Sequence, residues 1–404
     1  MKYLFHFNTF NDIDHMTPVV WKFLEKGEAV DVIFLSDYDF NEDYRIVFLS
    51  KYKKFRVYRV SFFQKVRNKL FFNTKSRALI KKYKIYKYII EFISENLWKN
   101  SYLKKRDIKA VIYEWGTFRL NLDDAIQQKT PTIVLPHGLN IFKNYDINNS
   151  ISERKKNSGN WPDFANRDIF DVYVVQSERH KKWCIDWGQS PEKVEVWGSA
   201  RFYPPWSALN LKLCGDMKRN IPKNLMKVVF FLPHWSYNVK VEKVITLLDK
   251  ISSLSYVHLF IKGHTRGSGT ILDEHIKAIG QKNNIEFDVK EHSPQLISYS
   301  DIVINFGSSI AIDALNMDTP SIHAPYLHSN RTIFDDGLVN YVADSDEEVI
   351  AFIDKNYSSV LSLPDKERKN LFYFKEVYGA VEEVDVHDSY YKNIKNIASL
   401  IPIK

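Results

Sequence analysis

The chain alternates short apolar runs, rich in β-branched and aromatic residues, with longer stretches of helical periodicity. Strands are predicted at residues 2–7, 29–35, 54–60, 109–115 and 131–136. The segments between them, such as TPVVWKFLEKGE and the long basic stretch 62–99, have a helical pattern. This alternation is typical of a parallel sheet with helices on both faces.

A second alternating set follows a polar segment. Residues 141–168 are rich in Asn, Ser, Asp and Lys without periodicity, so we expect an exposed connecting loop. Further strands are predicted at 170–176, 193–198, 227–233, 256–263, 284–289, 301–306 and 320–325. The pattern therefore predicts two doubly wound α/β domains, residues 1–168 and 169–404, with the site expected in a cleft between them. A last helix at 388–400 could pack back onto the first domain.

Composition agrees with two globular cores. The 404 residues are 45% hydrophobic and 26% charged. No window reaches the roughly 18 apolar residues of a membrane span, and the opening MKYLFHFNTF reads as a strand. We therefore expect a cytoplasmic protein, which could be peripheral on the inner face of the membrane.

The net charge of +8 is unevenly distributed. Residues 51–110 hold 19 Lys and Arg against three acidic residues, a net charge of +16, so the remainder carries −8. Because aromatic residues interleave with the cations, this stretch could be a solvated helix face, a surface for anionic lipid or acidic glycan, or a nucleic-acid site. It shows no recognised nucleic-acid module, so we expect no nucleic-acid partner.

Polar motifs follow the predicted strands of both halves. The first half carries Glu114-Trp115-Gly116, Pro136-His137-Gly138 with Asn140 close behind, and Gly198-Ser199-Ala200-Arg201. The second half carries Pro233-His234-Trp235, Lys262-Gly263-His264 and Gly307-Ser308-Ser309. Each motif alone could be an ordinary turn, but ligands of open α/β sheets bind at the carboxyl ends of strands. Six such ends together indicate a functional site.

The Gly307-Ser308-Ser309 motif joins a buried strand to a helix. Two hydroxyls and the free N–H groups of a first helical turn suit a phosphate, whereas simple capping explains only one serine.

The sequence lacks GxxxxGK[ST] and GxGxxG, which argues against P-loop and dinucleotide chemistry. His and Cys never occur at zinc spacing, the acidic pair 37/39 has no other acid–base partner, and the pair 344/346 lies in a helix-capping context, so no metal and no cofactor is expected.

These motifs resemble those of bacterial GT-B glycosyltransferases and of CDP-glycerol glycerophosphotransferases that build surface polymers. The similar segments are PHG (136–138), GSAR (198–201), PHW (233–235), KGH (262–264) and SDIVINFGSSIAIDALNMDTP (300–320). Polysialyltransferases and Kdo transferases share a similar set, and both groups use cytidine nucleotides. Two departures stand out: Thr265 replaces the usual proline after His264, and Trp115 interrupts the usual acidic pair.

The resemblance implies roles for particular residues. His264, Ser308 and Ser309, with Gly263 and Gly307 in the same loops, would hold the nucleotide phosphate, and Lys262 or Arg201 would offset its charge. Glu114 would be the general base for an acceptor hydroxyl, with His137 as the competing base or as a donor-orienting group. His234, Asp313 and Asn140 rank below these, and Asp313 is as readily structural.

Several functions remain open at this point. The first expectation is a metal-independent glycosyltransferase that moves Kdo or sialic acid from a CMP donor to a growing capsule, O-antigen or lipopolysaccharide glycan. A teichoic-acid type CDP-polyol phosphotransferase and a UDP-sugar-dependent GT-B enzyme, acting by transfer or epimerisation, are the enzymatic alternatives. A basic scaffold that binds membrane or nucleic acid is the non-enzymatic one.

Overall fold

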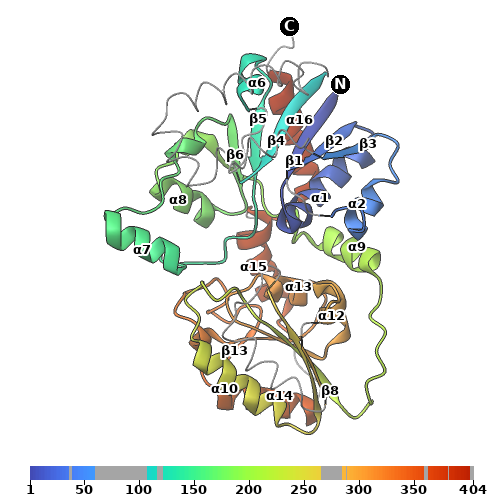
Figure 1. Cartoon of the computed structure of the whole chain (residues 1–404), viewed down its shortest axis with the longest axis vertical. Coiled ribbons are helices and arrows are strands. Elements are labelled where there is room, and N and C mark those ends of the chain that lie inside the picture. The colour runs from blue at the N-terminus through green and yellow to red at the C-terminus, as the bar shows by residue number, and fades with distance from the viewer. Residues whose placement is uncertain are drawn as a thin grey trace, which may run out of the picture. The chain divides into compact units, whose positions relative to one another are not determined.

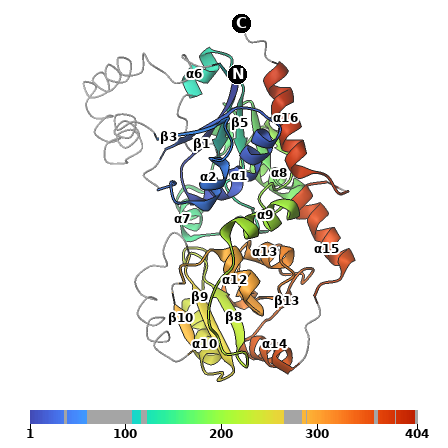
Figure 2. The same ribbon diagram turned by 90° about the vertical axis from the view of Figure 1, so that its right-hand side faces the viewer.

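The computed structural model describes residues 1–35, 39–59, 107–115, 122–264, 284–287, 289–358, 363–380 and 382–400. The chain divides into two compact units, drawn from two sides in Figures 1 and 2. Unit 1 comprises Met1–Gly138, Phe164–Arg201 and Val384–Lys404, and unit 2 comprises Leu139–Asp163 and Phe202–Glu383. Most of the basic stretch 51–110 lies outside the described residues.

Unit 1 is built on a seven-stranded sheet in the order β3-β2-β1-β4-β5-β6-β7, and all its pairings are parallel. Its strands are β1 (Lys2–Phe7), β2 (Val30–Phe34), β3 (Phe55–Arg59), β4 (Ile108–Glu114), β5 (Thr132–Leu135), β6 (Val172–Val175) and β7 (Val194–Val196). Its helices are α1 (Phe10–Glu25), α2 (Tyr44–Leu49), α6 (Leu122–Gln127), α8 (Glu178–Asp186) and α16 (Val386–Leu400), with 3₁₀ turns η1 (Ala165–Arg167) and η2 (Pro191–Lys193).

The core of unit 1 forms because successive residues of a strand face opposite sides of the sheet. Tyr3 and Phe5 of β1 both contact the ring of Phe23 on α1, at centroid distances of 4.5 and 6.1 Å. The next residue, His6, instead lies against the ring of Tyr113 of β4. The same Phe23 contacts Tyr391, so α16 packs on α1 within this unit (Figure 1).

Unit 2 repeats the winding with six parallel strands in the order β10-β9-β8-β11-β12-β13. The strands are β8 (Met226–Phe231), β9 (Val257–Lys262), β10 (Ile285–Phe287), β11 (Ile302–Asn305), β12 (Ser321–His323) and β13 (Tyr341–Val342). The helices are α7 (Asn149–Ser158), α9 (Pro204–Cys214), α10 (Val241–Ser252), α12 (Ser293–Tyr299), α13 (Ile310–Asn316), α14 (Asp346–Ser358) and α15 (Lys366–Phe372), with the 3₁₀ turn η3 (Pro325–Leu327) and the π-helix η4 (Tyr373–Tyr378).

Two apolar layers sandwich the sheet of unit 2. Val228 and Phe230 pack in the layer covered by α10 and α14, whereas Val229 and Phe231 pack in the layer of α12 and α13. All four side chains are at most 5% exposed. Burying a side chain of this size stabilises the fold by about 1.5–3 kcal/mol, so this alternation holds helices to both faces.

The strand pairing changes the grouping that the sequence predicted. Residues 170–176 and 193–198 form β6 and β7, which extend the first sheet instead of beginning the second. The predicted division near residue 168 therefore falls inside unit 1. After a first segment of unit 2 at Leu139–Asp163, the chain enters unit 2 again at Phe202 and returns to unit 1 at Val384. The pattern could not show this because a parallel strand reads alike in either sheet.

The predicted loop at 141–168 is wrong in part, because α7 lies within it. Asn148 caps this helix by accepting from the Ile151 N–H at 3.0 Å, and Gly159 ends it in a left-handed conformation. None of its residues is buried, so the helix carries no apolar stripe and leaves no periodicity in the sequence.

Both sheets have the doubly wound order in which the chain reverses direction across the sheet beside its first strand. These switch points lie between β1 and β4 in unit 1 and between β8 and β11 in unit 2. Ligands of such sheets bind at the carboxyl ends of the strands on either side, so the fold marks one edge of each unit. No described helix is long and apolar enough to cross a membrane.

Candidate functional sites

In unit 1, three ionisable side chains meet at the switch point. Glu114 is the last residue of β4, His137 follows β5, and Asp12 stands in the first turn of α1 directly after β1. The imidazole Nδ1 of His137 contacts both Glu114 Oε1 and Asp12 Oδ1, the latter at 3.1 Å. The Glu114 and Asp12 side chains are 7% and 0% exposed, whereas that of His137 is 33% exposed.

The local fold of α1 fixes Asp12. Its Oδ2 accepts hydrogen bonds from the backbone N–H groups of Asn8 and Thr9, at 2.5 and 2.7 Å. Thr9 is the N-cap of α1, and Asp12 completes the capping box three residues later. The carboxylate is thus held by the helix start while its other oxygen faces His137.

Opposing effects set the charge of His137. Burial alone would lower the pKa of its imidazole, but the hydrogen bonds with Asp12 and Glu114 raise it to about 9. Burial raises the pKa of Glu114, and the hydrogen bond with His137 acts against that rise. Because two carboxylates share Nδ1, that nitrogen carries the proton, and Nε2 lies 3.2 Å from Asn11 Nδ2.

The same three residues could also bind a divalent cation. One ligand atom from each lies within 4.8 Å of the others, a spacing that suits one imidazole and two carboxylates around a metal. The hydrogen bonds already described satisfy these atoms without an ion. The arrangement can therefore either hold a proton at His137 or bind a metal.

Aromatic side chains surround this cluster. Trp115 follows Glu114 with a φ of 49°, a left-handed conformation that is unusual for a bulky residue. Its ring stacks near His180 at 6.1 Å, and the guanidinium of Arg167 lies 4.6 Å from its centroid. Trp115 therefore lies beside the acid–base cluster. Its backbone is strained, and nothing in the neighbouring sequence requires that strain.

Arg201 pairs with a carboxylate of unit 1. It belongs to unit 1, where its Nε donates to Asp14 Oδ2 at 2.6 Å, and the buried Arg45 donates to the other oxygen at 2.7 Å. Burial would raise the pKa of Asp14, but the two guanidinium groups lower it to about 2. Arg201, predicted as an alternative to Lys262 for offsetting the phosphate charge, thus has an acidic partner within its own unit, and its part in phosphate binding stays a prediction.

In unit 2, the other predicted residues gather at the carboxyl ends of β8, β9 and β11. The rings of His234 and His264 meet edge to face at 5.6 Å, and His234 Nδ1 lies 2.7 Å from Ser236 Oγ. Lys262 Nζ donates to the carbonyl of Val289, and Gly263 joins this lysine to His264. These strands neighbour one another in the sheet, so the predicted motifs share one edge.

The Gly307-Ser308-Ser309 turn follows β11 at the same edge. Gly307 has a φ of 68°, the left-handed conformation that glycine adopts without strain. Ser308 Oγ accepts weakly from the Ile310 N–H at 3.4 Å, and Ser309 makes no capping hydrogen bond through its side chain. Capping therefore does not account for both hydroxyls, and phosphate binding by this turn stays a prediction.

Asp313 and Asn140, two of the lower-ranked residues, have local partners. Asp313 on α13 is 2% exposed and lies near Tyr373, whose pKa rises through burial first and through neighbouring groups including Asp313. Asn140 belongs to unit 2, where its Oδ1 accepts from the Phe142 N–H at 3.1 Å. Both contacts fit structural roles.

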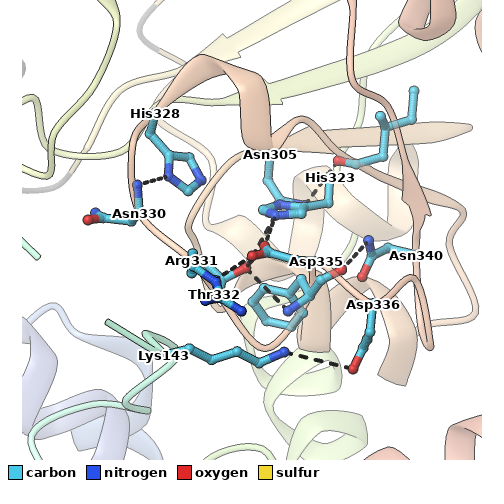
Figure 3. A network of polar contacts seen from close by, with 12 residues as sticks. Lys143, Asn305, His323, His328, Asn330, Arg331, Thr332, Asp335, Asp336 and Asn340 are labelled. Carbon is cyan, nitrogen blue, oxygen red and sulfur yellow. Dashed lines mark hydrogen bonds and ion pairs between the residues drawn. The ribbon is translucent and has the colours of Figure 1, made fainter. Parts of the chain in front are cut away.

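A polar network that sequence reasoning missed follows β12 (Figure 3). His323, the last residue of β12, lies 2.9 Å from Asp335 Oδ1 through its Nε2, and Thr332 donates to the same carboxylate oxygen at 2.5 Å. His328 Nδ1 accepts from the Asn330 N–H at 2.9 Å. The segment HAPYLHSNRT after that strand was the available signal, as was NTFNDIDH after β1 for Asp12 and Asp14.

Comparison with known proteins gives the fold class. No protein-family model and no curated protein matches the chain. Among solved structures, an S. aureus MnaA–UDP co-structure is similar at 14% identity and a TM-score of 0.58, over 99% of this chain and 98% of that one. The UDP-GlcNAc 2-epimerase of Neisseria meningitidis bound to UDP-GlcNAc is similar at 13% identity and a TM-score of 0.58, over 99% and 100%.

A glycotransferase of kitacinnamycin is also similar, at 11% identity and a TM-score of 0.52 over 99% of both chains. Identities this low establish the fold alone. The chain has a GT-B fold of two doubly wound units, and the predicted fold class is confirmed.

Proposed function

We propose that this protein is a nucleotide-sugar-dependent glycosyltransferase that uses a UDP-sugar donor. The observation that carries the proposal is the His137 cluster, an imidazole held by two buried carboxylates at the switch point of a GT-B unit. The uridine nucleotide is supported by two of the similar structures, a co-structure with UDP and an epimerase bound to UDP-GlcNAc. The proposal assigns acceptor activation to unit 1 and donor binding to unit 2.

His137 is the proposed general base. Its Nδ1 is bonded to both carboxylates, so Nε2 is the nitrogen that takes a proton from an acceptor hydroxyl, which must displace the Asn11 amide from its contact with Nε2. Asp12 and Glu114 then stabilise the resulting imidazolium and hold the ring in place. Glu114, the base favoured by the sequence motifs, is 7% exposed with one oxygen engaged, so it acts as a positioning residue.

In unit 2, Ser308, Ser309, His264 and Lys262 are the proposed ligands of the donor phosphates. Transfer breaks the bond between the sugar and the phosphate and leaves negative charge on the departing nucleotide. Donors at fixed positions stabilise that charge without a metal.

Nucleotide binding tests the proposal first. A ligand that binds only the folded state raises stability by RT ln(1 + [L]/Kd), about 2.7 kcal/mol at 100-fold excess over Kd. We expect UDP to raise the melting temperature more than CMP, CDP, GDP or AMP. The double variant Ser308→Ala/Ser309→Ala should lose this shift, and Ser308→Thr/Ser309→Thr, which keeps both hydroxyls, should retain part of it.

A CMP-sugar donor is the second candidate, because the KGH motif and the paired serines resemble those of Kdo and sialic acid transferases. A larger shift with CMP would favour it, and a larger shift with CDP would favour the polyol phosphotransferase. Absence of a shift with every nucleotide would contradict the enzymatic proposal.

An assay without acceptor separates transfer from epimerisation. An epimerase converts UDP-GlcNAc at C2 with no second substrate, and proton NMR of the sugar would detect the change. We expect UDP-GlcNAc to stay unchanged in this assay. Accumulation of the C2 epimer would show that the enzyme is an epimerase and not a transferase. The proposed nucleotide-binding site would still stand.

A further inference from the structure

His328 presents a buried hydrogen-bond donor that no described residue satisfies. The side chain is 3% exposed, and its Nε2 has no hydrogen-bond partner within the described part of the chain. A buried polar group left unpaired costs about 1–3 kcal/mol. Such a group therefore calls for a partner beyond the described residues, such as a bound ligand.

The surrounding hydrogen bonds determine which nitrogen carries the proton. Nδ1 accepts from the Asn330 N–H, so in the neutral ring the proton lies on Nε2 (Figure 3). Burial first, and then the neighbouring His323, lower the pKa of His328 to about 4. The ring is therefore neutral near pH 7 and offers a single N–H, at Nε2.

Asn330 in turn is held rigidly. Its Nδ2 donates to the carbonyls of Ile147 and Tyr237, both at 3.1 Å. Its Oδ1 accepts from Asn144 Nδ2 at 3.2 Å and from Asn238 Nδ2 at 3.0 Å. Four side-chain hydrogen bonds thus fix the residue whose N–H sets the tautomer of His328.

The free N–H lies against the Gly307-Ser308-Ser309 turn. A methyl group added to Gly307 would lie 3.4 Å from His328 Nε2, nearer than any other atom of that ring. The ring also stacks near Phe306, with centroids 6.3 Å apart and planes at 22°. The donor therefore stands beside the glycine that leaves the turn open, next to two hydroxyls that capping does not both use.

We infer that His328 Nε2–H donates a hydrogen bond to a phosphate oxygen of a ligand bound at the Gly307-Ser308-Ser309 turn. Phosphate oxygens only accept, which matches a neutral ring with one donor and two neighbouring hydroxyls. This inference rests on the proposed function in so far as the phosphate belongs to the nucleotide. His328 is then a specificity residue that distinguishes a nucleotide from its nucleoside.

Two substitutions separate the donor from the rest of the ring. In His328→Asn the amide oxygen can replace Nδ1 as acceptor for the Asn330 N–H, but nothing replaces Nε2. In His328→Gln the amide nitrogen reaches the position of Nε2 and keeps a donor. Isothermal titration with UDP, uridine and inorganic pyrophosphate then measures what the Nε2 donor contributes.

We expect His328→Asn to weaken UDP and pyrophosphate binding by roughly 10- to 100-fold, as for a lost hydrogen bond to a charged group. Uridine affinity should stay unchanged, and His328→Gln should stay within about threefold of the wild type. A purely structural role would lower the melting temperature of both variants and weaken all three ligands alike. Unchanged UDP affinity in a folded His328→Asn protein would overturn the inference while leaving the proposed function standing.

Pyrophosphate makes the two failures distinguishable. If the wild type binds pyrophosphate but not UDP, and His328→Asn loses that binding, the phosphate contact stands and the nucleotide proposal falls. If the wild type binds neither, both fall. Should His328→Asn fail to fold, NMR of the wild type labelled with ¹⁵N-histidine decides: saturation with UDP must shift the imidazole Nε2–H signal that is missing from the spectrum of His328→Gln, and no shift of that signal would overturn the inference.

Discussion

His137 lies between two carboxylates whose positions come from different parts of unit 1. Asp12 is fixed by the capping box of α1, and Glu114 by the end of β4. Both accept from the same imidazole nitrogen, so the choice between Glu114 and His137 as base becomes a division of labour. In the proposed function, proton transfer is the role of the more exposed His137, and the carboxylates raise its pKa.

The first prediction concerns His137. His137→Ala should lower kcat by about 10²- to 10⁴-fold, the usual contribution of a general base, with UDP affinity nearly unchanged. In the wild type kcat/KM should rise with pH up to about 9, because the base must first lose the proton that the carboxylates stabilise. Glu114→Gln removes one of those carboxylates, so the rise should move to lower pH.

Three outcomes would contradict this assignment. Abolition of transfer by Glu114→Gln at every pH would make Glu114 the base. A kcat/KM that falls as pH rises would remove His137 from the basic role. Loss of activity on chelation, restored by a divalent ion, would instead assign Asp12, Glu114 and His137 to a metal site.

The pH dependence of folding stability gives an independent test of the raised pKa of His137. The folded-state pKa of His137 lies above its unfolded value, so protonation stabilises the fold fully below about pH 6.5, and this contribution disappears as pH rises through about 9. The melting temperature difference between wild type and His137→Ala should therefore be larger at pH 6 than at pH 9.5.

At the scale of elements, the turn from β11 to α13 depends on one glycine. Gly307 adopts a φ of 68° beside the His328 ring, so a side chain there would strain the backbone and crowd the imidazole. Sequence reasoning identified the Gly-Ser-Ser motif because a strand and a helix flank it. It could not identify His328, which reaches the turn from a separate loop after β12.

The second prediction compares two glycines. Gly307→Ala should destabilise the fold by about 1–2 kcal/mol from the left-handed backbone and should also weaken UDP binding. Gly159 at the end of α7 has nearly the same φ, 69°, with no described atom within 4 Å of an added methyl. Gly159→Ala should therefore lower stability similarly, by chemical denaturation, without changing UDP affinity. Equal losses of UDP affinity in the two variants would show that the turn from β11 to α13 has no direct role in UDP binding.

At the scale of the molecule, unit 1 is assembled from three separate stretches of the chain. Its last stretch contributes α16, where Tyr390 donates to the Gly198 carbonyl at 2.8 Å and His387 Nε2 lies 2.9 Å from the Ala200 carbonyl. Tyr390 is 2% exposed and contacts the ring of Trp197. The helix at the far end of the sequence is thus part of the core of unit 1.

The third prediction tests that assembly. Tyr390→Ala should destabilise unit 1 by about 3–5 kcal/mol, the usual cost of removing a large buried aromatic side chain. Hydrogen exchange should then accelerate in β1 and β4, while β8, β9 and β11 of unit 2 keep their protection. Leu400→Ala, on the same helix at 78% exposure, is the matched control and should change little. Uniform acceleration in both units would contradict the division of the chain.

The sequence alone determined the strands, the parallel α/β class and the polar strand ends, because alternation, periodicity and turn residues are local properties. Residues 2–7 were predicted as a strand and form β1, and Glu114 and His137 were predicted from the ends of their strands. Only the tertiary structure decided that β6 and β7 complete the first sheet, that Asp12 reaches His137 and that His328 reaches Gly307. Those contacts join residues far apart in the chain, and packing between whole elements selects them, so no local pattern records them.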